Sequence, residues 1–152
     1  MKRAKARRIW LGVASAGGIA ALALGSATMR PRCTQINGGD SISVPLSQLA
    51  RGAVSFFCYN DSAGERVRFI LARDEDGNVH SVLDACHQCS GYHQGYTSSK
   101  SELICRFCGN RYNLKTMEKG RDSCVPVKLP SKQRDGMVEV KVADLKQGKS
   151  LF

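Results

Sequence analysis

Four cysteines arranged as two Cys-x-x-Cys pairs are the residues of this chain best suited to chemistry. Cys86 and Cys89 form the first pair, Cys105 and Cys108 form the second, and fifteen residues separate the pairs. Both sulfurs of such a turn can point at one metal, and two turns supply four thiolates in a roughly tetrahedral arrangement. That arrangement suits Zn²⁺ or an iron–sulfur cluster. The spacing predicts a metal centre, with two disulfides or buried thiols as the alternative.

The formal net charge of the 152-residue chain is +10, and most of the excess lies at the N-terminus. Residues 1–32 hold seven of the 23 basic residues and none of the 13 acidic residues, so 16 basic and 13 acidic residues remain elsewhere. A nearly balanced folded part argues against nucleic acid as a partner. The basic N-terminus instead points to a membrane.

An uncharged segment from Ile9 to Met29 follows the basic cluster and is long enough, at 21 residues, to span a bilayer as a helix. The basic residues before it predict an N-terminus in the cytoplasm and the remaining chain outside. Arg7 and Arg8, which precede an apolar pair, resemble a twin-arginine export signal. We expect residues 1–30 to form a signal anchor, with a cleaved signal peptide as the alternative.

Short strands separated by turns dominate the chain that follows. Residues 31–43 are rich in Pro, Asn, Gly and Asp and predict a linker, and residues 46–50 predict one helical turn. Alternating and β-forming residues predict seven strands, at 54–59, 66–73, 79–83, 102–104, 112–114, 125–129 and 138–142. The strand at 66–73 has one apolar face, so we expect it to be half-buried. These patterns predict a metal-binding β-domain over 44–145, a small antiparallel sandwich or barrel, and a frayed tail over 146–152.

The order of these features resembles a Rieske-type iron–sulfur domain over about residues 66–142. An Asp76-Gly77 turn precedes the first cysteine loop, and the run 105–109 is similar to the second Rieske loop. Gln88 and Cys108 stand where a Rieske protein carries histidines, so the site differs from an ordinary Rieske centre. The resemblance implies a mainly β protein. Its small antiparallel Rieske-like β-sandwich would carry two Cys-x-x-Cys metal-binding loops and follow one N-terminal transmembrane or signal helix.

The all-cysteine site and the N-terminal segment are more similar to a bacterial family, the FtrD-like membrane iron–sulfur proteins. Six motifs carry this resemblance: Val67-Arg68-Phe69, Asp76-Gly77, Asp84-Ala85-Cys86-x-x-Cys89, Gly95-Tyr96, Cys105-x-x-Cys108-Gly109 and Cys124. The resemblance implies an inner-membrane protein whose globular domain lies in the periplasm. It also implies service to ferrous iron uptake or another membrane redox system.

Electron transfer is the function that four thiolates favour. We expect Cys86, Cys89, Cys105 and Cys108 to bind an iron–sulfur cluster, [2Fe–2S] in preference to [4Fe–4S], and to exchange electrons with a redox partner protein in or at the membrane. A structural Cys₄ zinc module of a membrane-associated complex is the alternative. A thiol oxidoreductase that uses the first pair is a third hypothesis. No carboxylate pair, nucleophile elbow or phosphate loop indicates other catalysis, so no catalytic residue is assigned.

Three further residues are candidates for the surroundings of the centre. Tyr112 would tune the centre through a hydrogen bond to sulfur, and His87 is either a neighbour of the metal or a solvated loop residue. In a Rieske-like domain the loop that holds Cys124 would cover the site, so this cysteine could shield the centre, bind it or form a disulfide. Both a Cys33–Cys58 and a Cys58–Cys124 disulfide are consistent with the sequence.

Overall fold

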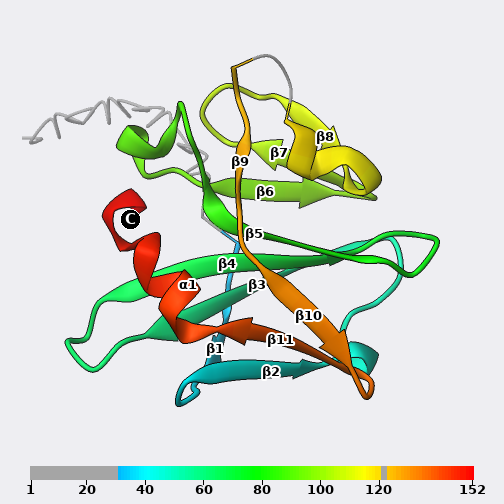
Figure 1. Cartoon of the computed structure of the whole chain (residues 1–152). Helices are drawn as coiled ribbons and strands as arrows, with labels where there is room; N and C mark the ends of the chain where they lie inside the picture. Colours follow the sequence, from blue (N-terminus) through cyan, green and yellow to red (C-terminus); the bar gives the residue numbers. More distant parts are fainter. Residues whose placement is uncertain (1–30, 121–122) are drawn as a thin grey trace, which may run out of the picture.

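The described part of the chain consists mainly of β-strands. A computed structural model describes residues 31–120 and 123–152, so the predicted signal anchor at 1–30 lies outside the described residues. Within them, eleven strands form one five-stranded sheet and two three-stranded sheets (Figure 1). No helix of this described part is both long enough and apolar enough to cross a membrane.

The five-stranded sheet lies in the middle of the domain and has the order β1-β3-β4-β5-β9. Its strands are β1 (Thr34–Ile36), β3 (Ala53–Asn60), β4 (Arg66–Arg73), β5 (Val79–Cys86) and β9 (Pro126–Lys128). Neighbouring strands in this sheet are antiparallel except for the parallel pair β1 and β3. The predicted strands at 54–59, 66–73, 79–83 and 125–129 correspond to four of these elements.

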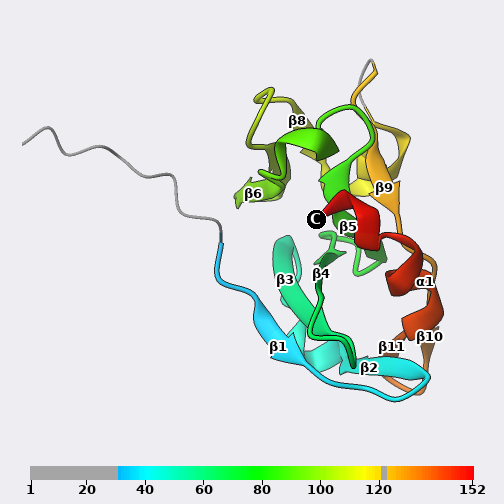
Figure 2. The ribbon, with the colours of Figure 1, turned by 90° about the vertical axis from the view of Figure 1, so that its left-hand side faces the viewer.

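Two small antiparallel sheets lie at opposite ends of the domain, on either side of the central sheet (Figures 1 and 2). One contains β10 (Ser131–Arg134), β11 (Met137–Lys141) and β2 (Ser41–Pro45). The other contains β6 (Tyr96–Ser99), β7 (Glu102–Cys105) and β8 (Arg111–Asn113). The second sheet and the turn after β7 carry two of the four predicted metal ligands, Cys105 and Cys108.

Strand β4 is buried on both faces, and the prediction of a half-buried strand is therefore wrong. Phe69 and Leu71 pack into a core that includes β2, β11 and the C-terminal helix. Ile70 and Ala72 point the other way, into a second core shared with β6, β7 and β8. The small β6–β8 sheet covers the face that the alternating pattern would leave to solvent. Arg68, on the same face, is buried against Asp84 and the segment that holds Pro31 and Cys33.

Two segments predicted as irregular are ordered elements. The predicted linker at 31–43 contains β1 and the start of β2, and Ile42 of β2 is buried in the first core. The predicted tail, 146–152, contains the end of α1 (Val142–Gln147) and the 3₁₀ turn η4 (Lys149–Leu151), and its Leu151 and Phe152 pack against the first core. Both predictions of irregular structure are therefore wrong. In the linker, polar and glycine-rich composition does not reveal that β1 pairs with β3 and that β2 pairs with β11.

The remaining helical elements are short 3₁₀ turns. They are η1 (Leu46–Gln48), η2 (Ser90–Tyr92) and η3 (Leu114–Lys119). The first matches the predicted helical turn at 46–50. A mainly β fold with antiparallel sheets and little helix is thus confirmed, while the Rieske-like topology stays a prediction.

Candidate metal centre

Five free cysteines meet at the end of the central sheet that faces β6–β8. Cys86 is the last residue of β5, and Cys89 immediately precedes η2. Cys105 is the last residue of β7, and Cys108 lies in the turn that follows it. Cys124 arrives from a third segment, two residues before β9. Four of the five thiols are buried and Cys108 is exposed.

The sulfur of Cys89 is the centre of this group. It lies within 4.8 Å of the sulfurs of the other four free cysteines, Cys86, Cys105, Cys108 and Cys124. The shortest recorded contacts are 3.6 Å between the sulfurs of Cys108 and Cys124 and 3.9 Å between those of Cys89 and Cys124. The structure thus brings together all four predicted ligands and Cys124.

The second cysteine loop presents backbone N–H groups to its sulfurs. The N–H groups of Phe107 and Cys108 hydrogen-bond to the Cys105 sulfur, and that of Asn110 hydrogen-bonds to the Cys108 sulfur. Gly109 closes the loop with a φ of 74°, a conformation that favours glycine. The loop is therefore shaped to support thiolate charge before any metal binds.

The thiols differ in how readily they become thiolates. Burial raises the pKa of Cys89 and of Cys105, and it raises the pKa of Cys124 to about 11. Burial acts on Cys108 in the same direction, but the Asn110 N–H and the neighbouring thiols outweigh it and lower the pKa of Cys108. A bound cation would compensate the buried thiolates, because metal coordination deprotonates thiols outright.

Two tyrosines border the centre from the β6–β8 sheet, with ring centroids 6.1 Å apart. Tyr112 donates a 3.1 Å hydrogen bond to the carbonyl oxygen of Cys124, so it contacts the backbone of the centre instead of a sulfur. Tyr96 is fully buried, and among the described residues its hydroxyl has no hydrogen-bond partner of standard geometry. Burial and the adjacent Cys86 sulfur both raise the pKa of Tyr96.

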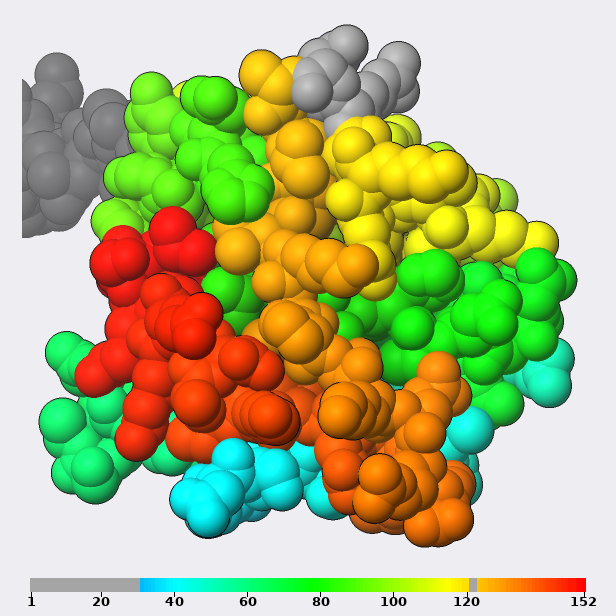
Figure 3. Space-filling view, viewed as in Figure 1, coloured from blue at the N-terminus to red at the C-terminus, as the bar shows by residue number. Residues whose placement is uncertain are grey.

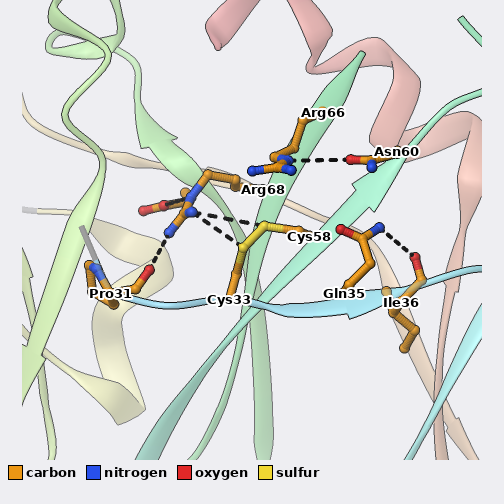
Figure 4. The surroundings of a disulfide bond; sticks show 9 residues. Pro31, Cys33, Gln35, Ile36, Cys58, Asn60, Arg66 and Arg68 are labelled. Carbon is orange, nitrogen blue, oxygen red and sulfur yellow. Dashed lines mark hydrogen bonds and ion pairs between the residues drawn. A yellow bond between two sulfur atoms is a disulfide. The ribbon is translucent and has the colours of Figure 1, made fainter. Parts of the chain in front are cut away.

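A buried network that sequence reasoning missed supports the first cysteine loop (Figure 4). Cys33 and Cys58 form a disulfide, which answers the open question of their pairing. Arg68 lies against it, with Nη1 3.3 Å from the Cys33 sulfur, and donates from Nε to Asp84. Asp84 accepts the Tyr96 backbone N–H at 2.7 Å. The sequence alone did not reveal this network, because Cys58 and Arg68 are seen to be neighbours only when the register of β3 and β4 is known.

The outer edge of the centre is exposed and aromatic. Tyr92 and Phe107, one from each cysteine loop, stack with ring centroids 3.6 Å apart and are 59% and 44% exposed. The side chain of His87 is exposed, and its backbone N–H donates to the Val125 carbonyl. These positions favour the interpretation of His87 as a solvated loop residue, while the aromatic pair forms an apolar patch beside Cys108.

The C-terminal segment lies close to the first cysteine loop, where the red segment meets the green one in Figure 3. Leu151 and Phe152 line a cavity of about 10 Å³ together with Cys86, Cys89 and Cys105. That volume holds roughly one water molecule. The space enclosed by these side chains on the inner side of the centre is therefore small.

The donor set fits a thiophilic metal group. Soft thiolates select zinc, copper(I) and iron–sulfur clusters, and the described candidate metal groups contain only cysteines. In a tetrahedral site with metal–sulfur bonds of about 2.3 Å, two ligand sulfurs lie about 3.8 Å apart. The contacts of 3.6 and 3.9 Å are close to this separation. Residues of the two cysteine pairs, with Cys124 beside them, could thus hold a metal.

Comparison with known proteins identifies the family. The model of the family described as membrane iron–sulfur containing protein FtrD-like matches residues 49–152, which include all five free cysteines. No curated protein sequence matches the chain. The matched region covers most of the chain, and the chain belongs to the FtrD-like membrane iron–sulfur protein family.

Proposed function

We propose that this protein is a membrane-anchored iron–sulfur electron carrier whose ligands are Cys86, Cys89, Cys105 and Cys108. The observation that carries the proposal is the convergence of free thiols around the Cys89 sulfur. The family name supports iron and sulfide as the occupants. When bound, an iron–sulfur cluster takes up and releases single electrons.

The surroundings of the thiols suit electron transfer better than catalysis. Cys86 and Cys105 are each 2% exposed, and the adjacent cavity measures only about 10 Å³. Backbone N–H groups of the second loop stabilise negative charge on Cys105 and Cys108. Burial and hydrogen bonds to sulfur are the features by which a protein tunes a reduction potential.

The exposed edge supplies a contact point for a redox partner. Cys108 is exposed there, beside the stacked rings of Tyr92 and Phe107. Weak redox complexes use small interfaces, and aromatic residues are enriched in the centres of interfaces. We infer that the partner protein docks over this edge, because it gives the shortest path from a ligand sulfur to the surface.

The basic N-terminus supports a membrane location for this exchange. The uncharged segment that follows it would anchor the chain in a bacterial inner membrane and hold the β-domain in the periplasm. The disulfide between Cys33 and Cys58 agrees with an oxidising compartment. There the carrier would serve iron uptake or another membrane redox system.

Metal and sulfide analysis tests the proposal. The full chain is purified in detergent without oxygen, and iron, acid-labile sulfide and zinc are measured per chain. We expect iron and sulfide in similar amounts and a visible absorption spectrum, both lost in Cys86→Ala and Cys105→Ala. Gln88→Ala is the matched control and should keep both, because Gln88 lies in the first cysteine loop with an exposed side chain and is not a predicted ligand. Iron and sulfide retained in Cys86→Ala would contradict the ligand assignment.

A structural zinc site is the second candidate, and one observation favours it. The sulfurs of all four other free cysteines lie within 4.8 Å of the Cys89 sulfur, a spacing compact enough for one tetrahedral ion. The same measurement separates the two candidates. Stoichiometric zinc without iron, sulfide or visible absorbance would contradict the electron carrier and support a structural zinc module.

A further inference from the structure

Cys124 brings a fifth thiol to a centre that requires four. Its sulfur lies 3.6 Å from that of Cys108 and 3.9 Å from that of Cys89. Because the sulfurs of Cys89 and Cys108 are also within 4.8 Å of each other, the three form a triangle. Cys124 therefore stands inside the group of sulfurs and not in a layer around it.

The two contacts have the separation expected for sulfurs that share a metal. Ligand sulfurs on one tetrahedral ion lie about 3.8 Å apart when the metal–sulfur bonds are about 2.3 Å. The Cys124 sulfur is at a comparable distance from two predicted ligands at once. A fixed position at ligand distance distinguishes Cys124 from a residue that merely excludes water.

The backbone around Cys124 is held by both cysteine loops. Tyr112, which follows the second loop, donates its hydroxyl hydrogen bond to the Cys124 carbonyl oxygen. His87, in the first loop, donates its backbone N–H to the carbonyl of Val125 at 3.0 Å. Pro126 of β9 is the register partner of Cys86. These contacts keep the Cys124 thiol at the centre whether or not that thiol is bound.

The ligand that Cys124 can replace is Cys108. Cys86 and Cys105 are buried at the ends of β5 and β7, and the Cys89 sulfur lies within 4.8 Å of every other free cysteine sulfur of the site. Cys108 is the exposed ligand and has the shortest contact to Cys124. Resting on the proposed function, we propose that Cys124 is a reserve ligand that takes the place of Cys108, with Cys86, Cys89 and Cys105 common to both ligand sets.

The exchange is balanced without any electron transfer. One metal–sulfur bond, that of Cys108, breaks, and one metal–sulfur bond, that of Cys124, forms. The Cys124 thiol gives up its proton as it binds, and the released Cys108 thiolate takes up a proton. Exposed thiols are the ones most open to oxidation, so a buried reserve would retain the metal group when Cys108 is lost.

Alanine variants of the full chain, purified in detergent without oxygen, test this proposal. Alanine cannot bind the metal through a side-chain oxygen, as serine could. We expect Cys108→Ala and Cys124→Ala each to keep the wild-type iron and sulfide content. The double variant Cys108→Ala/Cys124→Ala should lose both, as should Cys86→Ala. The visible circular dichroism of Cys108→Ala should differ from wild type, while that of Cys124→Ala should not.

Three results would overturn the reserve ligand. They are loss of iron and sulfide in Cys108→Ala, the same loss in Cys124→Ala, and retention in the double variant. Far-ultraviolet circular dichroism and an intact Cys33–Cys58 disulfide establish that each variant is folded. The wild-type protein separates this proposal from the proposed function. If wild type lacks iron and sulfide, the proposed electron carrier is contradicted. If wild type contains both, the variants test the role of Cys124.

Discussion

Arg68 donates a 2.8 Å hydrogen bond from Nε to Oδ2 of Asp84, and the exposed fractions of the two side chains are only 11% and 1%. Asp84 precedes Cys86 by two residues, and its Oδ1 accepts the backbone N–H of Tyr96. Arg68 also contacts the Cys33 sulfur of the disulfide. This ion pair therefore connects the disulfide, the first cysteine loop and β6 within one buried network.

Neutralising the Asp84 carboxylate should destabilise the fold strongly. In Asp84→Asn the buried Arg68 guanidinium loses its counter-charge, and breaking such a pair costs about 3 kcal/mol. Denaturant unfolding of wild type and variant without oxygen measures the loss. Glu102→Gln is the matched control, because Glu102 pairs with Arg111 at 3.0 Å on the surface and should cost less than about 1 kcal/mol. Equal losses in the two variants would contradict the role of burial.

Removing the disulfide should also lower the free energy of unfolding. Cys33 and Cys58 are separated by 25 positions, and closing a loop of this size stabilises a protein by roughly 3 kcal/mol. Denaturant unfolding of Cys33→Ser/Cys58→Ser checks the magnitude. Peptide mapping without reductant should recover Cys33 joined to Cys58, whereas a peptide that joins Cys58 to Cys124 would show the pairing to be wrong.

The turn between β4 and β5 should make stability dependent on acid pH. Burial of Asp74 raises its pKa, but hydrogen bonds from His80 and Asn78 outweigh burial and hold the pKa of Asp74 below its usual range. A carboxyl group of this kind stabilises the fold above its unfolded pKa of about 3.9, and the contribution falls as the pH drops toward the folded value.

Asp74→Asn should therefore lose less stability than wild type when the pH falls from about 6 to about 3. Denaturant unfolding at both pH values provides the comparison. Asp76→Asn is the control, because that carboxylate lies in the same turn with a side chain 59% exposed. If Asp74→Asn loses as much stability as wild type between these two pH values, Asp74 is not the source of the pH dependence.

The buried hydroxyl of Tyr96 should raise the reduction potential of the centre. It lies beside Cys86 and has no standard hydrogen-bond partner among the described residues, so it is free to donate to a sulfur of the occupied site. Tyr96→Phe removes the donor, and a hydrogen bond of about 1 kcal/mol corresponds to about 40 mV for one electron. We expect the potential to fall by that amount, measured by redox titration.

Tyr112→Phe is the comparison for this effect. Its hydroxyl donates to the Cys124 carbonyl oxygen, so its removal should alter the potential less than the loss of the Tyr96 hydroxyl. A potential unchanged in Tyr96→Phe would show that this hydroxyl does not interact with the centre.

Local patterns in the sequence predicted the elements whose neighbours are close in the chain. The bounds of β4, the turn at 74–78 and the final hairpin at 135–136 follow from alternation and from Asp-Gly turns. Cys-x-x-Cys spacing likewise predicted two ligand loops, because each pair of sulfurs lies within one turn.

Long-range pairing explains what the sequence did not reveal. Arg68 alternates with apolar residues and resembles a solvent-facing residue, but Asp84 and the distant Cys33 bury it in the fold. Segments with Asn, Gly and Asp form β1 and β2 only because β3 and β11 pair with them. The position of Cys124 between Cys89 and Cys108 depends on the pairing of β9 with β5.

A redox titration of the full chain, followed by visible absorbance and electron paramagnetic resonance, tests the central claim most directly. Four thiolates carry more negative charge than two thiolates and two neutral imidazoles, so a reversible one-electron reduction is expected below about −150 mV, the lower end of the range for histidine-ligated Rieske centres. A midpoint inside that range would contradict an all-thiolate [2Fe–2S] cluster, the type expected here. A protein that contains zinc and accepts no electron would contradict the electron carrier altogether.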